Sequence, residues 1–235
     1  MTEHIVSAFE NELKGLAQQV AEMGGLTEKQ IVGAIDSLIK VDVALANRVR
    51  AADPVIDAKQ REIEELGILI IAKRQPMAID LREIVGALRI AADLERMADL
   101  AKNIAKRVTV INSSLPMPKV TGGFDAMARL ALERVKDVLD AYAQRDVAAA
   151  LEVWRSDGDI DALYNSLFRE LLTYMLEDPR NIGSCTHLLF CAKNLERIGD
   201  HATNIAETVH YMVHGVTLAD ERPKLDTTTM VATGT

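Results

Sequence analysis

An internal duplication is the feature that most restricts how this 235-residue chain can fold. Asp42–Asp53 (DVALANRVRAAD) is repeated 104 residues later as Asp146–Asp157 (DVAAALEVWRSD). Leu94–Asp99 (LERMAD) is repeated 101 residues later as Leu195–Asp200 (LERIGD). The smaller second offset is what a three-residue difference in loop length would produce. The chain therefore consists of two copies of one unit, because self-similarity at a fixed spacing marks a repeated architecture.

Each copy has the apolar spacing of amphipathic helices. The predicted helices cover 3–40, 42–51, 54–75 and 77–112 in the first half, and 122–145, 146–156, 158–178 and 181–215 in the second. Helix 42–51 is expected to end before Asp53-Pro54, because a residue that precedes proline avoids the α region. Gly24-Gly25 could bend or interrupt the first helix. Thirteen glycines and six prolines are too few for the turns of an all-β fold. We predict an all-α protein of two tandem three-helix bundles.

The segment 112–123 separates the two units. It contains two prolines, two glycines and two serines, a composition that breaks regular structure. We predict a first bundle over 1–117, a second over 118–218, and a flexible tail over 219–235.

Charge and hydropathy exclude several classes of partner. The net charge of −8 and the pI near 5.2 argue against nucleic-acid binding. The longest strongly apolar run, Ile68–Ala72, is much shorter than the ~20 residues of a membrane span. The N-terminus lacks the pattern of a secretory signal, and two cysteines are too few for a disulfide framework. We expect a cytoplasmic protein that reaches the membrane only through partners.

A stripe of acidic and amide side chains occurs once in each half. Glu95, Asp99 and Asn103 are spaced one helical turn apart, and Glu196, Asp200 and Asn204 repeat that spacing. Like charges at this spacing destabilise a helix by roughly 0.2–0.5 kcal/mol, yet both copies have them.

Carboxylate oxygens at this spacing suit divalent cations, which would neutralise the repulsion. Asp57 and Asp161, on the preceding helices, could add further oxygens. The alternative is a solvated acidic face whose charge is offset by Arg96 and Arg197.

The repeated segments resemble the duplicated E(D)-x-x-x-D signature of the PhoU family. Lys73–Pro76 followed by Asp80–Arg82, and Thr173–Asp178, also resemble that family, and the resemblance covers about residues 3–218. It implies two three-helix bundles in a non-enzymatic, cytoplasmic negative regulator of phosphate uptake and of the phosphate-starvation response. The implied partners are the ATPase of the phosphate ABC transporter and a phosphate-sensing histidine kinase.

The resemblance also implies metal binding, because some PhoU proteins hold multinuclear metal clusters through the acidic motifs. Those motifs fall on Glu95, Asp99, Glu196 and Asp200, with Asn103 and Asn204 beside them. The expected cofactors are divalent or iron-type metal ions. One departure is that Asp93 in the first half is replaced by Asn194 in the second, which predicts less negative charge at the second site.

A metal-dependent carboxylate-bundle enzyme or a metal-storage protein is the alternative function. Glu207 and His210 have the Glu-x-x-His spacing of di-iron bundles, but such sites need two of these units. The equivalent residues in the first half are Lys106 and Thr109. The missing second unit favours the role that the resemblance implies, a non-enzymatic adaptor between the phosphate ABC transporter and the histidine kinase.

Helix 77–112 has apolar residues on two faces, and one bundle core can cover only one of them. We therefore expect the stretch from Leu81 to Leu88 to pack against the other bundle or a second subunit, and we favour a homodimer.

Overall fold

The computed structural model describes residues 2–111 and 117–218, with side chains described for 8–111 and 122–218. Every long element in these ranges is a helix, and no strand occurs in them. The elements are α1 (Thr2–Lys40), α2 (Val43–Arg74), α3 (Ile79–Val108), α4 (Met117–Gln144), α5 (Val147–Arg155), α6 (Asp157–Glu177), the 3₁₀ turn η1 (Pro179–Asn181) and α7 (Ile182–His214). The predicted all-α, duplicated fold is confirmed.

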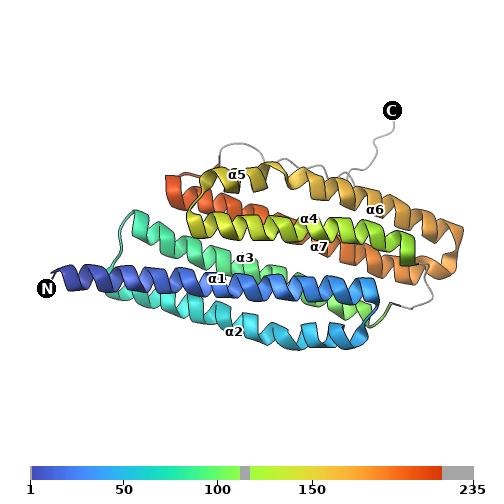
Figure 1. Cartoon of the computed structure of the whole chain (residues 1–235), viewed down its shortest axis with the longest axis horizontal. Helices are drawn as coiled ribbons and strands as arrows, with labels where there is room; N and C mark the ends of the chain where they lie inside the picture. The colour runs from blue at the N-terminus through green and yellow to red at the C-terminus, as the bar shows by residue number, and fades with distance from the viewer. Residues whose placement is uncertain (1, 112–116, 219–235) are drawn as a thin grey trace.

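The helices form two elongated bundles that lie side by side (Figure 1). α1, α2 and α3 pack together in the first, and α4, α5–α6 and α7 in the second. The bundles meet mainly where α3 packs against α7, with a smaller contact between α1 and α4. No described helix has the length and apolar character that crossing a bilayer requires.

Both bundles begin their second helix with the same cap. The carboxylate of Asp42 accepts a hydrogen bond from the Leu45 backbone N–H at 2.9 Å, and Asp146 accepts one from Ala149 at 3.0 Å. The preceding residue has a positive φ in each case, 50° at Val41 and 54° at Arg145. A side-chain oxygen at this position satisfies an otherwise unpaired N–H of the first turn, which explains why the repeated segments begin with aspartate.

The prediction that a short helix ends before Asp53-Pro54 is wrong in the first half, because α2 continues through Pro54. Proline removes one backbone hydrogen bond from a helix interior. Pro54 lies on the exposed side of α2, where the freed carbonyl can be solvated, whereas Asp53 and Ile56 are buried and hold the helix in the core. In the second half Gly158 replaces Pro54, and the helix does break, between Arg155 and Asp157.

Other predicted boundaries also differ from the structure, and α3 ends at Val108 rather than at 112. α4 begins at Met117 rather than at 122, so Pro118 lies in the first turn, where proline is tolerated. α1 runs unbroken through Gly24-Gly25. The remaining part of the predicted linker, 112–116, and the predicted tail, 219–235, lie outside the described residues.

The second apolar face of α3 is covered within the chain. Leu88 packs over Gly67 of α2, whereas Gly86 faces Met212 of α7. A Cβ atom at Gly86 would lie 2.2 Å from the Met212 sulfur, so glycine allows the two central helices to approach closely. Leu81, at the start of this stretch, remains 37% exposed. The stretch from Leu81 to Leu88 therefore contacts its own bundle through Leu88 and the other bundle through Gly86.

We expect Gly86→Ala to lower the free energy of unfolding by about 1–3 kcal/mol, because the added methyl group forces Met212 out of its place. Gly25→Ala is the matched control: Gly25 is an exposed helical glycine with no neighbour within 4 Å of a Cβ. That change should raise stability by about 0.5–1 kcal/mol.

Denaturant unfolding of the full chain measures both effects. In the Met212→Ala background, Gly86→Ala should lose most of its effect, since the clashing side chain is gone. Equal stabilisation by the two alanine substitutions would contradict this account of the α3–α7 contact.

Candidate functional site

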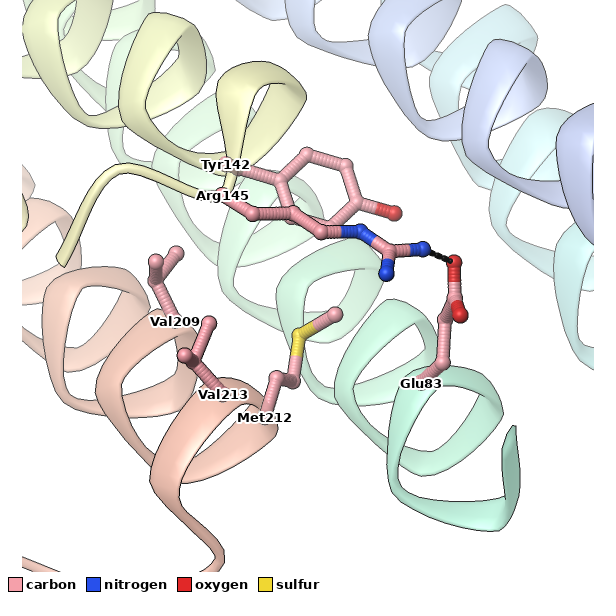
Figure 2. A pocket seen from close by; sticks show the side chains of 6 residues that line it. All are labelled: Glu83, Tyr142, Arg145, Val209, Met212 and Val213. Carbon is pink, nitrogen blue, oxygen red and sulfur yellow. Dashed lines mark hydrogen bonds and ion pairs between the residues drawn. The ribbon is translucent and has the colours of Figure 1, made fainter. Parts of the chain in front are cut away.

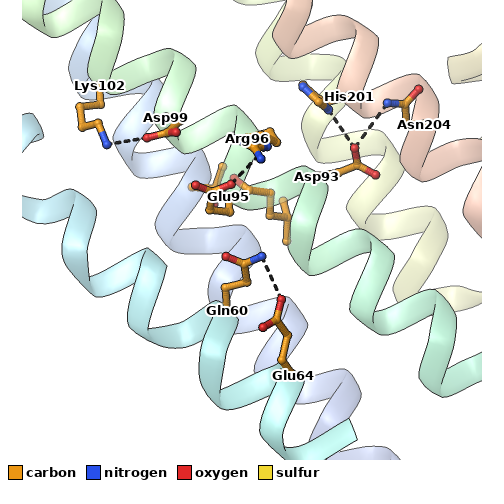
Figure 3. Close-up of polar contacts among 11 residues, drawn as sticks. Gln60, Glu64, Asp93, Glu95, Arg96, Asp99, Lys102, His201 and Asn204 are labelled. Atoms are coloured by element: carbon orange, nitrogen blue, oxygen red, sulfur yellow. Dashed lines mark hydrogen bonds and ion pairs between the residues drawn. The ribbon is translucent and has the colours of Figure 1, made fainter. Parts of the chain in front are cut away.

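The first acidic cluster consists of Asp57 on α2 and of Glu95 and Asp99 on α3. Burial raises the pKa of the Glu95 carboxyl, and the negative charges of Asp99 and Asp57 raise it further, while Arg96 and Lys102 act in the opposite direction. The Glu95 carboxylate lies 3.6 Å from Arg96 Nε (Figure 3). The structure therefore brings together three of the predicted site residues of the first half.

A lysine supplies the counter-charge of this first cluster. Lys102 Nζ donates to Asp99 Oδ1 at 2.5 Å and to Asp53 Oδ2 at 2.6 Å. Asp53 is only 4% exposed, and its other oxygen accepts from Gln30 Nε2 at 3.0 Å. Burial lowers the pKa of Lys102, but the hydrogen bonds to Asp53 and Asp99 outweigh it, so the pKa is raised overall. Lys102 is therefore held as a cation between two carboxylates.

The second acidic cluster consists of Asp161 on α6 and of Glu196 and Asp200 on α7. Burial raises the pKa of Glu196, and Asp200 and Asp161 add to the rise, while the hydrogen bond from Lys193 lowers it. Lys193 Nζ donates to Glu196 Oε1 at 2.8 Å. Glu196 is 6% exposed, and its buried Oε2 has no hydrogen-bond partner among the described residues. Burial is thus more complete at this carboxylate than at Glu95.

The two lysines do not occupy equivalent positions. Lys102 follows Asp99 by three residues, and its counterpart in the second half is Thr203, which donates to Asp157 at 2.9 Å. Lys193 precedes Glu196 by three residues, and its counterpart is Ala92. The lysine that offsets the repulsion therefore follows its acid along the helix in the first half and precedes it in the second. Sequence reasoning missed both lysines, although the spacing of three residues to an acid indicates such ion pairs.

The two predicted asparagines lie apart from these carboxylates. Asn103 is exposed on α3. Asn204 donates to Asp93 Oδ1 at 3.4 Å, and His201 Nδ1 lies 2.8 Å from the same oxygen (Figure 3). Asn204, His201 and Asp93 therefore form a polar contact between α7 and α3. Asp93 faces the other bundle. The position at which the two halves differ, Asp93 against Asn194, therefore lies at the interface between the bundles in the first half.

A small pocket lies at one end of the same interface. It has a volume of about 170 Å³ and is lined by Glu83, Tyr142, Arg145, Val209, Met212 and Val213 (Figure 2). Arg145, in the turn after α4, forms an ion pair with Glu83 of α3 and so links the two bundles. Burial raises the pKa of the Tyr142 hydroxyl to about 12, with a smaller effect from the charge of Glu83.

The donor set of the two clusters suits a hard or borderline cation, because it consists of carboxylate oxygens. A cation there would neutralise the like charges that raise the pKa of Glu95 and Glu196. Within the described ranges, no three His, Cys, Asp or Glu side chains already surround one point as metal ligands. Because Lys102 and Lys193 hold carboxylates of the two clusters, cation binding requires these lysines to turn away.

Comparison with known proteins identifies relatives of this chain. The model of the PhoU domain matches it twice, at residues 20–108 and 124–209. A protein of Rhizobium meliloti named phosphate-specific transport system accessory protein PhoU homolog is 54% identical over 232 residues, covering 99% of this chain and 98% of that protein. A protein of the same name from Caulobacter vibrioides is 50% identical over 226 residues, covering 96% and 98%.

Solved structures of PhoU proteins are also similar to this chain. The crystal structure of PhoU from Pseudomonas aeruginosa matches with a TM-score of 0.84 and 39% identity, covering 88% of this chain and all of that one. That of the phosphate transport system regulatory protein PhoU from Streptococcus pneumoniae has a TM-score of 0.83 and 27% identity, covering 89% and 99%.

We expect Glu196→Gln to raise the stability of the metal-free protein at pH 7. The folded-state pKa of Glu196 lies above its ordinary 4.5, so between the two values the folded state binds more protons than the unfolded state. The contribution of this group to stability is therefore complete below about pH 4.5 and is lost as the pH rises through the folded-state value.

Thermal melts of parent and variant across this pH range test the effect. The advantage of Glu196→Gln should be largest at pH 7 and should disappear on acidification. Glu133→Gln, at an exposed position on α4, should show no such trend. A variant that is less stable than the parent at pH 7 would contradict the account.

Proposed function

This chain belongs to the PhoU family, and we propose that it is a regulatory accessory protein of phosphate uptake. The observation that carries the proposal is the double match of the PhoU domain to both bundles, together with 54% identity to a named accessory protein along nearly the whole of both chains. The matched relatives bear the names of accessory and regulatory proteins, so this family is not one of enzymes. The alternative of a carboxylate-bundle enzyme is thereby disfavoured.

We further propose that the chain acts in the cytoplasm as an adaptor between the ATPase of the phosphate ABC transporter and a phosphate-sensing histidine kinase. In this role it restrains both phosphate uptake and the phosphate-starvation response when phosphate is plentiful. The relatives' names, which tie them to the phosphate-specific transport system, support the transporter as a partner.

Deletion of the gene should derepress phosphate-scavenging genes in phosphate-rich medium. Transcript levels of these genes measure the effect, and the parent gene supplied in trans should restore repression. Unchanged expression in the deletion strain, under conditions where the parent strain makes the protein, would contradict the regulatory role.

We also propose that each acidic cluster binds divalent or iron-type metal ions. Asp57, Glu95 and Asp99 would hold the metal in the first half. Asp161, Glu196 and Asp200 would do so in the second, with the orphaned Oε2 of Glu196 as a ready donor. A bound cation supplies positive charge to this site, and the chain's own part is to hold the carboxylates together and to release the two lysines.

Metal should raise the thermal stability of the parent protein, because a ligand that binds only the folded form stabilises it by mass action. At 100 times the dissociation constant the gain is about 2.7 kcal/mol per site. The double variant Asp99→Asn with Asp200→Asn should lose most of this gain while keeping the metal-free fold. Thermal melts with and without Mg²⁺, Mn²⁺, Fe²⁺ or Zn²⁺ measure it.

A matched control is Asp36→Asn with Asp140→Asn, another duplicated pair of acids that lies outside both clusters. This pair should leave the metal response of the parent intact. If every metal leaves the parent unchanged, or shifts parent and cluster variant equally, the two clusters are not metal sites.

The homodimer also remains our proposal. Its support is the exposed apolar group Met77, Ile79 and Leu81 at the connection between α2 and α3, with exposed fractions of 80%, 60% and 37%.

A further inference from the structure

An apolar groove runs between α1 and α2 on the first bundle. It encloses about 480 Å³, and its walls include Leu26, Val32, Leu45 and Val55. Val32 is 41% exposed and Val55 56% exposed, so the walls face solvent. Gly33 keeps the two helices close, since a Cβ there would lie 2.8 Å from Val49 Cγ2. The groove is therefore a surface hollow of mainly apolar character.

Two cations flank this apolar surface. Lys29 of α1 and Arg48 of α2 line the groove and are exposed. Within the described part of the chain, neither forms an ion pair. The protein as a whole carries a net charge of −8. An apolar groove flanked by cations on an acidic protein is complementary to an apolar segment that carries acids.

The duplication supplies an internal comparison, because the second bundle has a hollow that overlaps the equivalent place. That hollow encloses about 270 Å³ and is lined in part by Asp137, Ala149 and Glu152. At the offset of 104 residues, Glu133 replaces Lys29 and Glu152 replaces Arg48, so both charges are reversed.

The apolar wall is replaced as well. Lys136 stands in the place of Val32, and Asp159 in the place of Val55. The buried residues beneath keep their apolar character, as with Ile31 against Val135 and Ile56 against Ile160. Core packing therefore does not require the apolar, cationic surface of the first groove, and a binding role accounts for it.

We propose that the α1–α2 groove is a docking site for an amphipathic helix of a partner protein, one whose apolar face is flanked by acidic side chains. Helices lay their apolar residues at i, i+3, i+4 and i+7 into grooves of this kind, and Lys29 and Arg48 select the acids beside them. The inference rests on the adaptor function proposed above, for which it assigns a surface.

A second copy of the chain fits the groove less well. On the second bundle, Glu152 lines the hollow, and Lys136 and Asp159 stand at the positions where apolar residues would be needed. This surface therefore offers no apolar ridge to fill the first groove.

Two fluorescent synthetic helical peptides test the proposal against the full chain by anisotropy. Both carry leucines at i, i+3, i+4 and i+7; one is flanked by glutamates and the other by lysines. The glutamate peptide should bind about tenfold more tightly or better. Lys29→Glu with Arg48→Glu, which copies the residues of the second half, should weaken its binding by about 10- to 100-fold and favour the lysine peptide.

The matched control is Glu133→Lys with Glu152→Arg, the reverse exchange on the second bundle, which should leave glutamate-peptide binding within about twofold. Val55→Asp should weaken binding of both peptides, since it removes an exposed apolar wall. Circular dichroism verifies the fold of each variant. Equal affinity for the two peptides, no binding of either, or equal losses in the two charge-exchange variants would overturn the proposal.

Light scattering on the same proteins tests the other possible occupant of the groove, a second copy of the chain. The charge exchange at Lys29 and Arg48 should leave the mass of the parent protein unchanged. If it converts a dimer to a 25.8 kDa monomer, the groove is an interface between copies and the docking proposal is wrong. If neither peptide binds but deletion of the gene derepresses the phosphate-scavenging genes, only the docking proposal is wrong. If deletion leaves the expression of those genes unchanged, the regulatory function is wrong.

Discussion

α3 and α7 pack against each other along the middle of the molecule, and the positions of the other helices follow from that contact. Each of these two helices packs against the other and against the core of its own bundle. A narrow stripe remains, which faces α2 on α3 and α6 on α7. Gly86 makes the approach of α7 possible, and the contact of Asp93 with His201 and Asn204 adds a polar link. The remaining stripe holds Glu95 and Asp99 on one helix and their counterparts on the other.

The carboxylates of these stripes are held together against their mutual repulsion. Apolar packing stabilises the helices that carry them, and one lysine in each half offsets part of the charge. Lys102 and Lys193 come from non-equivalent positions and bind different carboxylates, Asp99 in the first half and Glu196 in the second. Burial is the largest cause of the raised pKa of both Glu95 and Glu196, and the charges of the neighbouring aspartates add to the rise. These partly buried, neighbouring carboxylates are the physical basis for proposing cation binding.

Local and periodic features were predictable from the sequence. The duplication, the apolar spacing and the facing of Asp57 towards Glu95 all appear in the structure, because they depend on helix geometry and on a repeated unit. The continuation of α2 through Pro54 was not predictable, since buried neighbours override the local preference. Nor were the placement of Asn204 against Asp93 and the groove between α1 and α2, because both depend on which helices become neighbours.

Titration of the Glu95 and Glu196 side-chain carboxyl carbons by NMR, in the metal-free full chain, tests the central claim most directly. That claim is that the duplicated fold holds carboxylates together at an electrostatic cost that a cation can relieve. Both groups should titrate above the ordinary 4.5, and added metal that binds should shift their apparent pKa downward. Titration of both groups at or below 4.5 without metal would contradict the account.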